Sequence, residues 1–466
     1  MENLFKPEIQ SPKSKVQSPK ISPARRAAFE ILQKIAAERG FSAVLLPIYE
    51  EKLKPEDRAL CHEITLGVLR NQTWLDASIT HFAGKEPGKL DLAVLIALRI
   101  GLYQLKFLSK IPARAAVNES VNLVHLAKKR SAAGFVNAIL RKSEREDFDP
   151  LTKIKDPLEK LSVETSHPVW LLKKWQTQFG YANTAALARV NNSAPPISFR
   201  TTAPPGEDVL GELENAGASL TKSQLAPNAW RAVGAGQKIR ELFAAGKIYL
   251  QDEASQLVAH FSAARNSEIF LDVCAAPGSK TSLIAQLRSE TQSLQSEVQK
   301  PFVAGDLSAS RANILRATIA RYAPGRVNVV RYDAEQHLPF ADGSFDRVLI
   351  DAPCSGTGTI RHNPEIRWHL RETDFARLTS KQSKILTNGA QIVRPGGQLI
   401  YSTCSLEPEE GEVVVAQFLA ENVDFEFAQI DLPKQLVSGA GEARTFPPRD
   451  DADGFYVAVL KRKNKK

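Results

Sequence analysis

Cysteine, methionine and aromatic residues are scarce in this sequence, and each shortage excludes a class of protein. Four cysteines in 466 residues, none close to another, supply neither a disulfide framework nor a zinc-binding cluster. One methionine and 7% aromatic residues provide neither a Met-rich groove nor an aromatic stacking platform. The longest apolar stretch, from Leu92, contains Arg99 and predicts a buried helix rather than a membrane span. We therefore expect a cytoplasmic protein that binds neither a membrane nor a metal.

Positive charge is concentrated in the first third of the chain. The net charge is +9, and residues 23–145 alone hold 20 Lys and Arg against 12 Asp and Glu. Such a surplus is expected of a segment that contacts a polyanion. A solvated basic surface that only aids solubility has the same composition, so charge alone leaves both interpretations open.

Four segments differ in composition and periodicity. Residues 1–22 are rich in Pro, Ser and Lys, lack an apolar signal core, and predict a disordered tail. Residues 23–145 have apolar residues at helical spacing and predict an all-α bundle. Residues 146–250 alternate helix and strand patterns, which predicts a small α/β subdomain, and residues 251–466 predict an α/β domain with a mainly parallel sheet. The helices expected in the bundle cover residues 24–37, 57–69, 73–81, 90–105, 113–127 and 134–142.

The predicted strands of the last segment are followed by residues that suit a ligand site. In a parallel sheet, ligands bind beyond the carboxyl ends of the strands. The first strand leads into small residues that let the backbone approach a ligand, but the first glycine of a phosphate-binding loop is missing. This loop consists of Cys274, Ala275, Ala276, Pro277, Gly278, Ser279 and Lys280. The predicted strands cover residues 269–273, 302–305, 327–331, 347–350 and 397–402.

Acidic residues follow the next three strands, at Asp306, Asp333 and Asp351. An acid after the second strand suits two ribose hydroxyls. Together with the small-residue loop, the three acids suit a ligand that has a ribose and an adenine but no phosphates. S-adenosylmethionine fits this description better than a dinucleotide does. The alternative is that these Asp side chains only cap the helices that follow them.

Two of the four cysteines, Cys354 and Cys404, come directly after consecutive predicted strands. If those strands are neighbours, both thiols lie over one cleft beside the cofactor. Carbon 5 of cytosine is too electron-poor to attack a methyl sulfonium, but a thiolate that adds to carbon 6 makes carbon 5 nucleophilic. After the transfer, a base must remove the carbon 5 proton before the thiol can leave. Two cysteines and a nearby acid fit this chemistry.

The motifs around these residues resemble a known family. FDRVLIDAPCSGTG with a downstream YSTCS is similar to the RNA 5-methylcytosine methyltransferases, and CAAPGSKT, RHNPEIRW and DGFY add to the resemblance. The N-terminal pieces ARRAAFEIL, DRALCHEITLGVLR, IGLYQL, IPARAAVNESVNLV and GFVNAILRK resemble the NusB-like RNA-binding bundle. Together they make the chain similar to the Sun/Fmu-type (RsmB/NOP family) ribosomal RNA cytosine-5 methyltransferases of bacteria. The resemblance implies a Rossmann-like methyltransferase domain at residues 251–466 and an RNA-binding subdomain at 146–250.

The resemblance also implies a role for each site residue. Cys404 would be the nucleophile, Cys354 would assist product release, Asp351 would hydrogen-bond the cytosine ring, and Lys280 would position Asp351. The loop Cys274 to Lys280 would cradle the methionine part of S-adenosylmethionine, and Asp351 also belongs to the cofactor site. Asp306 would hold the ribose and Asp333 would lie beside the adenine. Ser279 stands where the family usually has a second glycine, which leaves the geometry of this turn in question. The expected RNA contacts are Arg25, Arg26, Arg58 and Arg70 in the bundle, and Arg361, Pro364 and Arg367 after Cys354.

Other functions remain open at this stage. A non-enzymatic NusB-like RNA-binding factor would need no cofactor loop and no strand-end cysteines. A DNA cytosine methyltransferase would use the cysteine of the Pro-Cys pair and would not need the one in Thr-Cys-Ser. A transfer RNA methyltransferase would have the same active site, and only the NusB-like segment favours small-subunit ribosomal RNA. We expect the protein to act as a monomer.

Overall fold

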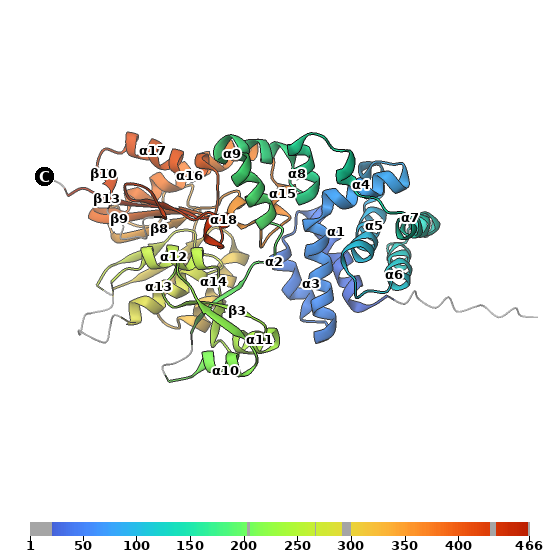
Figure 1. Cartoon of the computed structure of the whole chain (residues 1–466). Coiled ribbons are helices and arrows are strands. Elements are labelled where there is room, and N and C mark those ends of the chain that lie inside the picture. Colours follow the sequence, from blue (N-terminus) through green and yellow to red (C-terminus); the bar gives the residue numbers. More distant parts are fainter. Residues whose placement is uncertain (1–20, 203–205, 266, 291–299, 429–434, 465–466) are drawn as a thin grey trace, which may run out of the picture. The chain divides into compact units, whose positions relative to one another are not determined.

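The computed structural model describes residues 21–202, 206–265, 267–290, 300–428 and 435–464. The chain folds into two compact units that meet in sequence after Ser166, and each unit is described by itself. Nearly all of the predicted tail, residues 1–22, lies outside the described residues. Figure 1 colours the first unit blue to green and the second green to red.

The first unit is an all-α bundle, as the sequence predicts. Its centre is α5, which is apolar around most of its circumference and packs against α1, α3, α4, α6 and α7. Two glycines permit this packing. A Cβ at Gly67 of α3 would lie 2.0 Å from Tyr103 of α5, and a Cβ at Gly101 would lie 2.6 Å from Leu140 of α7. The helices are α1 (Pro23–Glu38), α2 (Ser42–Glu50), α3 (Pro55–Arg70), α4 (Gln72–Ala83), α5 (Leu92–Phe107), α6 (Ala113–Leu126), α7 (Ala133–Arg145) and α8 (Pro157–Thr165).

Two features of this unit differ from the sequence-based expectations. Helix α2 was not expected, because it holds Pro47 and leaves Val44 and Ile48 exposed instead of showing an amphipathic pattern. Residues 146–166, expected in the small subdomain, belong to the first unit because α8 packs against α4. The physical reason is that Leu158 and Leu161 of α8 are buried.

The second unit begins with a small α/β subdomain. Helix α9 (Val169–Val190) contains a kink at Gly180, whose φ of +76° is outside helical values. It leads to a four-stranded antiparallel sheet of order β2-β3-β1-β4, packed with two helices. The strands β2 and β3 were missed in the sequence, since neither shows a run of strongly apolar residues. The elements are β1 (Ile197–Thr201), α10 (Val209–Asn215), β2 (Ser219–Lys222), β3 (Ala229–Val233), α11 (Gly236–Ala244) and β4 (Ile248–Leu250).

The remainder of the second unit surrounds a nine-stranded sheet of order β11-β12-β13-β9-β8-β5-β6-β7, with β10 paired to β13. Five strands are parallel and match the five that the sequence predicts. They are β5 (Phe270–Asp272), β6 (Phe302–Asp306), β7 (Asn328–Arg331), β8 (Phe345–Asp351) and β9 (Val393–Thr403). The other four are antiparallel, so the sheet is mixed rather than mainly parallel. They are β10 (Phe425–Phe427), β11 (Val437–Gly439), β12 (Glu442–Arg444) and β13 (Tyr456–Arg462).

Both faces of this sheet are covered, which explains why its parallel strands have no polar alternation. Side chains such as Phe270 and Leu349 pack with α12, α13 and α14. Their neighbours Leu271 and Val348 point the other way and pack with α16 and α17. The helices are α12 (Glu253–Ser262), α13 (Ser279–Glu290), α14 (Ala309–Tyr322), α15 (Ile366–His369), α16 (Asp374–Gln391), α17 (Glu412–Glu421) and α18 (Pro447–Asp450).

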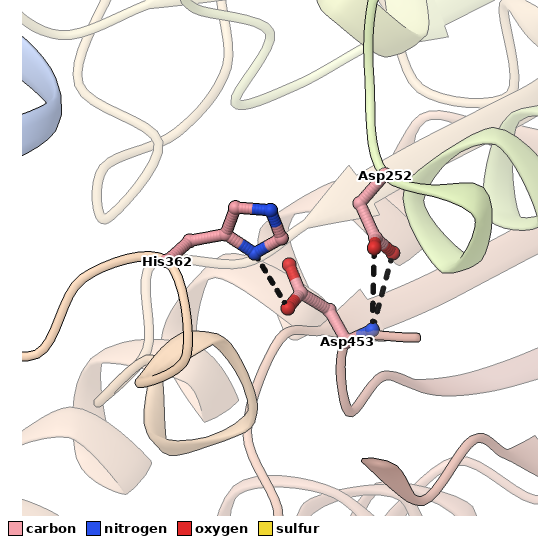
Figure 2. Close-up of side chains that lie close together, drawn as sticks. All are labelled: Asp252, His362 and Asp453. Atoms are coloured by element: carbon pink, nitrogen blue, oxygen red, sulfur yellow. Dashed lines mark hydrogen bonds and ion pairs between the residues drawn. The ribbon is translucent and has the colours of Figure 1, made fainter. Parts of the chain in front are cut away.

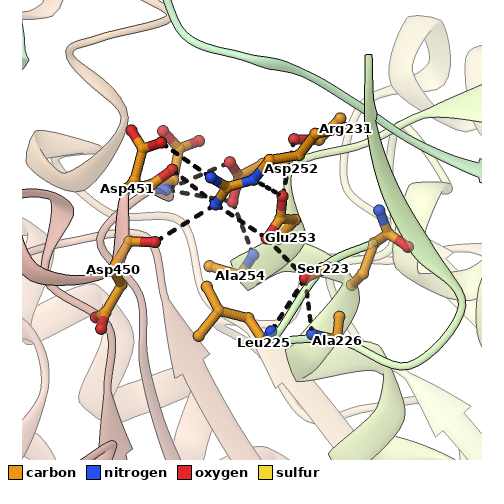
Figure 3. Close-up of polar contacts among 12 residues, drawn as sticks. Ser223, Leu225, Ala226, Arg231, Asp252, Glu253, Ala254, Asp450 and Asp451 are labelled. Carbon is orange, nitrogen blue, oxygen red and sulfur yellow. Dashed lines mark hydrogen bonds and ion pairs between the residues drawn. The ribbon is translucent and has the colours of Figure 1, made fainter. Parts of the chain in front are cut away.

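An arginine of the small sheet ties it to the larger one. Arg231 of β3 forms an ion pair with Glu253, which is buried at the start of α12, and a second with Asp451, at 2.9 Å. Figure 3 shows the guanidinium between these two carboxylates. The other oxygen of Asp451 accepts a 2.6 Å bond from Arg361, in the segment after Cys354. The small sheet and that segment therefore share one carboxylate.

We predict that Gly67→Ala destabilises the protein. The added methyl group would overlap the Tyr103 ring, whose hydroxyl donates a 2.6 Å bond to Glu63. Overpacking of this kind costs about 1–3 kcal/mol, more than the gain of up to about 1 kcal/mol from helix propensity. Denaturant unfolding followed by circular dichroism should therefore show a lower free energy of unfolding.

The matched control is Gly134→Ala. A Cβ at Gly134, in the first turn of α7, has no neighbour within 4 Å among the described residues. This variant should be as stable as the parent or more stable, by up to about 1 kcal/mol. Equal stability of the two variants would contradict the packing that we describe for α3 and α5.

Candidate active site

The two strand-end cysteines lie together at the carboxyl edge of the parallel strands. Strands β8 and β9 are neighbours, and the sulfur atoms of Cys354 and Cys404 are 3.4 Å apart. The hydrogen bond to Cys404, burial and the nearby Glu410 carboxylate all raise the pKa of the Cys354 thiol well above its usual value. Cys354 is thus a protonated thiol near neutral pH, and its S–H can donate to the Cys404 sulfur. The two thiols therefore lie side by side on neighbouring strands, as the sequence predicts.

A lysine, a carboxylate and a hydroxyl stand beside the cysteines. The Lys280 Nζ donates to Asp351 Oδ2 at 2.7 Å, and the Ser402 hydroxyl donates to Asp351 Oδ1 at 2.7 Å. Burial lowers the pKa of Lys280, but the Asp351 charge more than offsets this and leaves it above the ordinary value. Lys280 is therefore a cation that fixes Asp351. This contact is the one that the family resemblance implies, whereas Ser402 was missed.

The loop Cys274 to Lys280 is held close to the sheet by its backbone. The Ala275 N–H donates to the Gly305 carbonyl at 2.8 Å, at the end of the neighbouring strand β6. Gly278 has a φ of +103°, and a Cβ there would lie 2.9 Å from Leu315, so this position requires glycine. Ser279 is the first residue of α13, where a side chain is accommodated. The glycine expected from the family at this position is thus not needed for the turn.

The acids after β6 and β7 have protein partners of their own. Asp306 accepts from the Arg311 guanidinium at 3.1 Å and from the Ala276 N–H at 3.3 Å. Asp333 accepts from the Glu335 N–H at 2.9 Å, which is a capping contact. Asp306 lies against the loop and suits the ribose role, whereas the contact of Asp333 also fits the simple capping interpretation. Both cofactor roles stay predictions.

A buried acid that the sequence analysis did not single out is Asp272, the last residue of β5. Its Oδ2 accepts from the Thr281 hydroxyl at 2.7 Å, and its Oδ1 has no partner among the described residues although it is buried. Burial raises the pKa of Asp272 to about 7. An unpaired buried acceptor beside a loop of small residues fits a ligand that brings a cationic donor. The amino group of the methionine part of S-adenosylmethionine is such a donor.

Most of the arginines expected to contact RNA are buried or half-buried among other residues of the protein. Arg25 is buried, where it donates to Gln104 at 2.6 Å and to Glu119 at 2.8 Å. Arg58 is half-buried and donates to the Leu53 carbonyl, and Arg70 is half-buried too. The structure therefore corrects the expectation for Arg25, because its charge is compensated within the bundle. Arg26 remains exposed at the surface, beside Glu30.

The three residues after Cys354 that were expected to contact RNA are buried too. Arg367 is completely buried and donates to Asn192 at 2.8 Å, at the end of α9. Arg361 is buried between Asp451 and the Ala194 carbonyl. Pro364 is buried as well. Arg361 and Arg367 anchor the segment to the small subdomain through Ala194 and Asn192. Contacts of these three residues with RNA stay predictions.

Three further titratable groups meet next to this segment. Asp252, His362 and Asp453 point toward one another (Figure 2), and one ligand-type atom from each lies within 4.8 Å of the others. His362 Nδ1 lies 2.9 Å from an Asp453 oxygen, and the Asp453 N–H donates to the Asp252 carboxylate at 3.3 Å. Burial and the Asp453 charge raise the pKa of Asp252 to about 7. The cluster joins RHNPEIRW to DGFY, two motifs that are far apart in the sequence.

Comparison with known proteins places this architecture in a family. The family model for 16S rRNA methyltransferases RsmB/F matches residues 259–461, the NusB family matches 22–145, and the ferredoxin-like domain of RsmF/B-like methyltransferases matches 167–235. A relative from Bacillus subtilis, named probable ribosomal RNA small subunit methyltransferase B, is 32% identical over 94% of this chain and 98% of its own. The chain belongs to the RsmB/F methyltransferase family.

Further relatives agree with this assignment. The ribosomal RNA small subunit methyltransferase B of Pasteurella multocida is 32% identical and covers 94% of this chain and 96% of its own. Among solved structures, PH0851 matches with a TM-score of 0.82, 25% identity and coverage of 96% of this chain and 100% of its own. NSun6 from Pyrococcus horikoshii, solved with SFG, shares the fold, with a TM-score of 0.55, 20% identity and coverage of 64% and 99%. The cofactor of this family is S-adenosylmethionine.

We predict that Asp272→Asn makes stability less dependent on pH. An exposed Asp has a pKa near about 3.9, whereas burial raises that of Asp272 to about 7. Between these values the folded state keeps a proton that the unfolded state has released. The stability from this group is thus complete below about pH 4 and is lost as the pH rises through about 7. Between about pH 5 and pH 8, the free energy of unfolding of the parent should fall by at least about 1 kcal/mol more than that of the variant.

Denaturant unfolding at several pH values measures this difference. The control is Asp342→Asn, since the Asp342 side chain is 75% exposed. The control should follow the parent at every pH. If Asp272→Asn also follows the parent, Asp272 is ionised in the folded protein over the whole range, which would contradict our description.

Proposed function

We propose that this protein methylates carbon 5 of a cytosine in small-subunit (16S) ribosomal RNA through a transient bond between Cys404 and the base. The observation that carries the proposal is the 3.4 Å approach of Cys354 and Cys404 beside the Lys280–Asp351 pair. Two thiols and an anchored acid at one sheet edge match what cytosine methylation needs. A methyltransferase that acts directly on a nucleophilic atom needs no second thiol.

Each side chain has a defined task in this proposal. The Cys404 thiolate adds to carbon 6 of the base and makes carbon 5 nucleophilic. Asp351, held by Lys280 and Ser402, hydrogen-bonds the ring during the addition. Bound S-adenosylmethionine supplies the electrophilic methyl group, and the residues that would hold it are the loop Cys274 to Lys280 with Asp306. A base then takes the carbon 5 proton, the electron pair of that C–H bond re-forms the double bond between carbons 5 and 6, and Cys404 leaves as a thiolate; Cys354 assists this step.

Ribosomal RNA is preferred over transfer RNA as the substrate because of the whole-length likeness to relatives named for the small ribosomal subunit. A non-enzymatic NusB-like factor is disfavoured, since a methyltransferase domain follows the bundle. The basic bundle would contribute phosphate contacts from exposed residues such as Arg26.

No helix among the described residues is long and apolar enough to span a membrane. A cytoplasmic location, a monomeric state and independence from metals stay predictions.

The test of this function is to map 5-methylcytosine in the ribosomal and transfer RNA of a strain that lacks the gene. We expect one cytosine of 16S rRNA to lose its methyl group, and the purified protein to restore it with S-adenosylmethionine. Loss of the modification from a transfer RNA instead would establish the alternative substrate.

The second prediction for the site separates the two cysteines by the order of their steps. Because Cys404 attacks first, Cys404→Ala should give neither methylated RNA nor a covalent adduct. If Cys354 acts only afterwards, Cys354→Ala should accumulate RNA bonded to Cys404. A denaturing gel should therefore show a protein–RNA band in Cys354→Ala that disappears in the double variant. A band in Cys404→Ala would mean that the two roles are exchanged.

A third prediction concerns Asp306 and the cofactor. If its carboxylate holds the ribose hydroxyls, Asp306→Ala should weaken S-adenosylmethionine binding by roughly 1.5–3 kcal/mol, as expected of a charge-assisted hydrogen bond. Calorimetric titration measures the affinity, with exposed Asp342→Ala as a control that should bind as the parent does. Unchanged affinity in Asp306→Ala would remove Asp306 from the cofactor site.

A further inference from the structure

One buried carboxylate connects the segments that follow the two cysteines. Glu410 lies in the short helical turn Pro408–Glu410 after β9, and its side chain is completely buried. Its Oε1 accepts from the Ser355 N–H at 2.9 Å, and its Oε2 accepts from the Ser405 hydroxyl at 2.6 Å. The Ser355 hydroxyl also donates to Oε2. Ser355 follows Cys354 and Ser405 follows Cys404, so one carboxylate holds the residue next to each thiol.

A glutamine of α16 completes this arrangement on the other side of Cys354. The Gln382 amide nitrogen donates to Glu410 Oε1 at 2.9 Å and to the Pro353 carbonyl at 3.0 Å. The residues before and after Cys354 are thereby tied to the same pair of side chains. The backbone of Glu410 is fixed too, because its carbonyl accepts from the Tyr401 hydroxyl at 2.8 Å.

Placing a carboxylate here has a cost in stability. A buried charge loses its hydration, and apolar side chains of similar size often fold as well or better. Four donors converge on the two oxygens of Glu410, which is the acceptor pattern of a carboxylate and not of an amide. A group that is costly to bury, and whose contacts all lead to the two cysteine segments, points to a role in the reaction.

We propose that Glu410 is a positioning residue for methyl transfer, which acts through Ser355 and Ser405 to hold the sulfurs of Cys354 and Cys404 at their close approach. This inference rests on the function proposed above. Glu410 itself touches neither thiol in the described contacts and is not a catalytic residue. The negative charge of Glu410 also supports the contact between the two sulfurs. It helps to raise the pKa of Cys354, so that this thiol keeps the proton that it donates to Cys404.

The first experiment compares steady-state methylation by Glu410→Gln and Glu409→Gln. Glutamine keeps the size of the side chain but turns an N–H toward donors. We expect kcat to fall roughly 10- to 100-fold, as for a small misplacement of reacting groups, with KM for RNA and cofactor nearly unchanged. Glu409 is the matched control, because its side chain is 44% exposed and pairs with Lys174. A kcat for Glu410→Gln that equals that of Glu409→Gln overturns the proposal.

The second experiment needs no RNA and no cofactor. Phenylarsine oxide bonds to two thiols that lie side by side, with release of water, and the 3.4 Å separation of the sulfurs suits one arsenic atom. The parent should bind one equivalent tightly, Cys404→Ala should not, and Glu410→Gln should bind at least about tenfold more weakly. Equal binding by Glu410→Gln and the parent refutes the positioning role. Weaker binding in Glu410→Gln, with a parent that does not methylate RNA, supports the positioning role while the proposed function fails.

The serines provide variants that fold even if Glu410→Gln does not. Ser355→Ala and Ser405→Ala each remove one hydroxyl and leave the carboxylate in place. Each should lower kcat and arsenical affinity in the same direction as Glu410→Gln. Because Ser405 and Glu410 act as a unit, the effect of Ser405→Ala on kcat should be largely absent when Glu410 is already Gln. Full additivity of the two changes, or no effect of either serine, contradicts the proposal.

Discussion

The active site depends on the parallel pairing of β8 and β9. In this register Asp351 lies opposite Ser402, so the residues that follow, Cys354 and Cys404, leave the sheet at the same level. The Ser402 hydroxyl donates a hydrogen bond to Asp351, its partner on the neighbouring strand, and this bond can form only in the observed register. A slip by one residue would turn the side chains of one strand to the opposite face. Sheet register, rather than loop conformation, thus sets which groups can react together.

The architecture and the reacting side chains could be predicted from the sequence because they depend on local patterns. Five parallel strands, the small-residue loop and the strand-end cysteines lie where periodicity and turn residues indicate. The antiparallel strand β13 could not be foreseen, since its pairing with β9 is a long-range contact. Helix α2 and strands β2 and β3 were missed because none of them has a clear apolar repeat.

The arginines show that composition does not predict which basic residues are exposed. Charge alone does not reveal burial, and Arg367 and Arg25 are as basic in the sequence as exposed Arg26. What decides their environment is the presence of acceptors from distant segments, such as Asn192 for Arg367 and Glu119 for Arg25. The same holds for the buried acids. Asp272 and Glu410 were not singled out in the sequence, and only the tertiary contacts show that they are enclosed.

The shared carboxylate of Asp451 has a mechanical consequence. Its two oxygens bind Arg231 of the small sheet and Arg361 of the segment after Cys354. Tilting the small sheet against the large one would break one of these ion pairs, unless the segment moved with it. Asp451 therefore links the small sheet to the segment after Cys354 within the second unit. It couples a movement of the small sheet to that segment, in addition to the contacts of Arg361 with Ala194 and of Arg367 with Asn192.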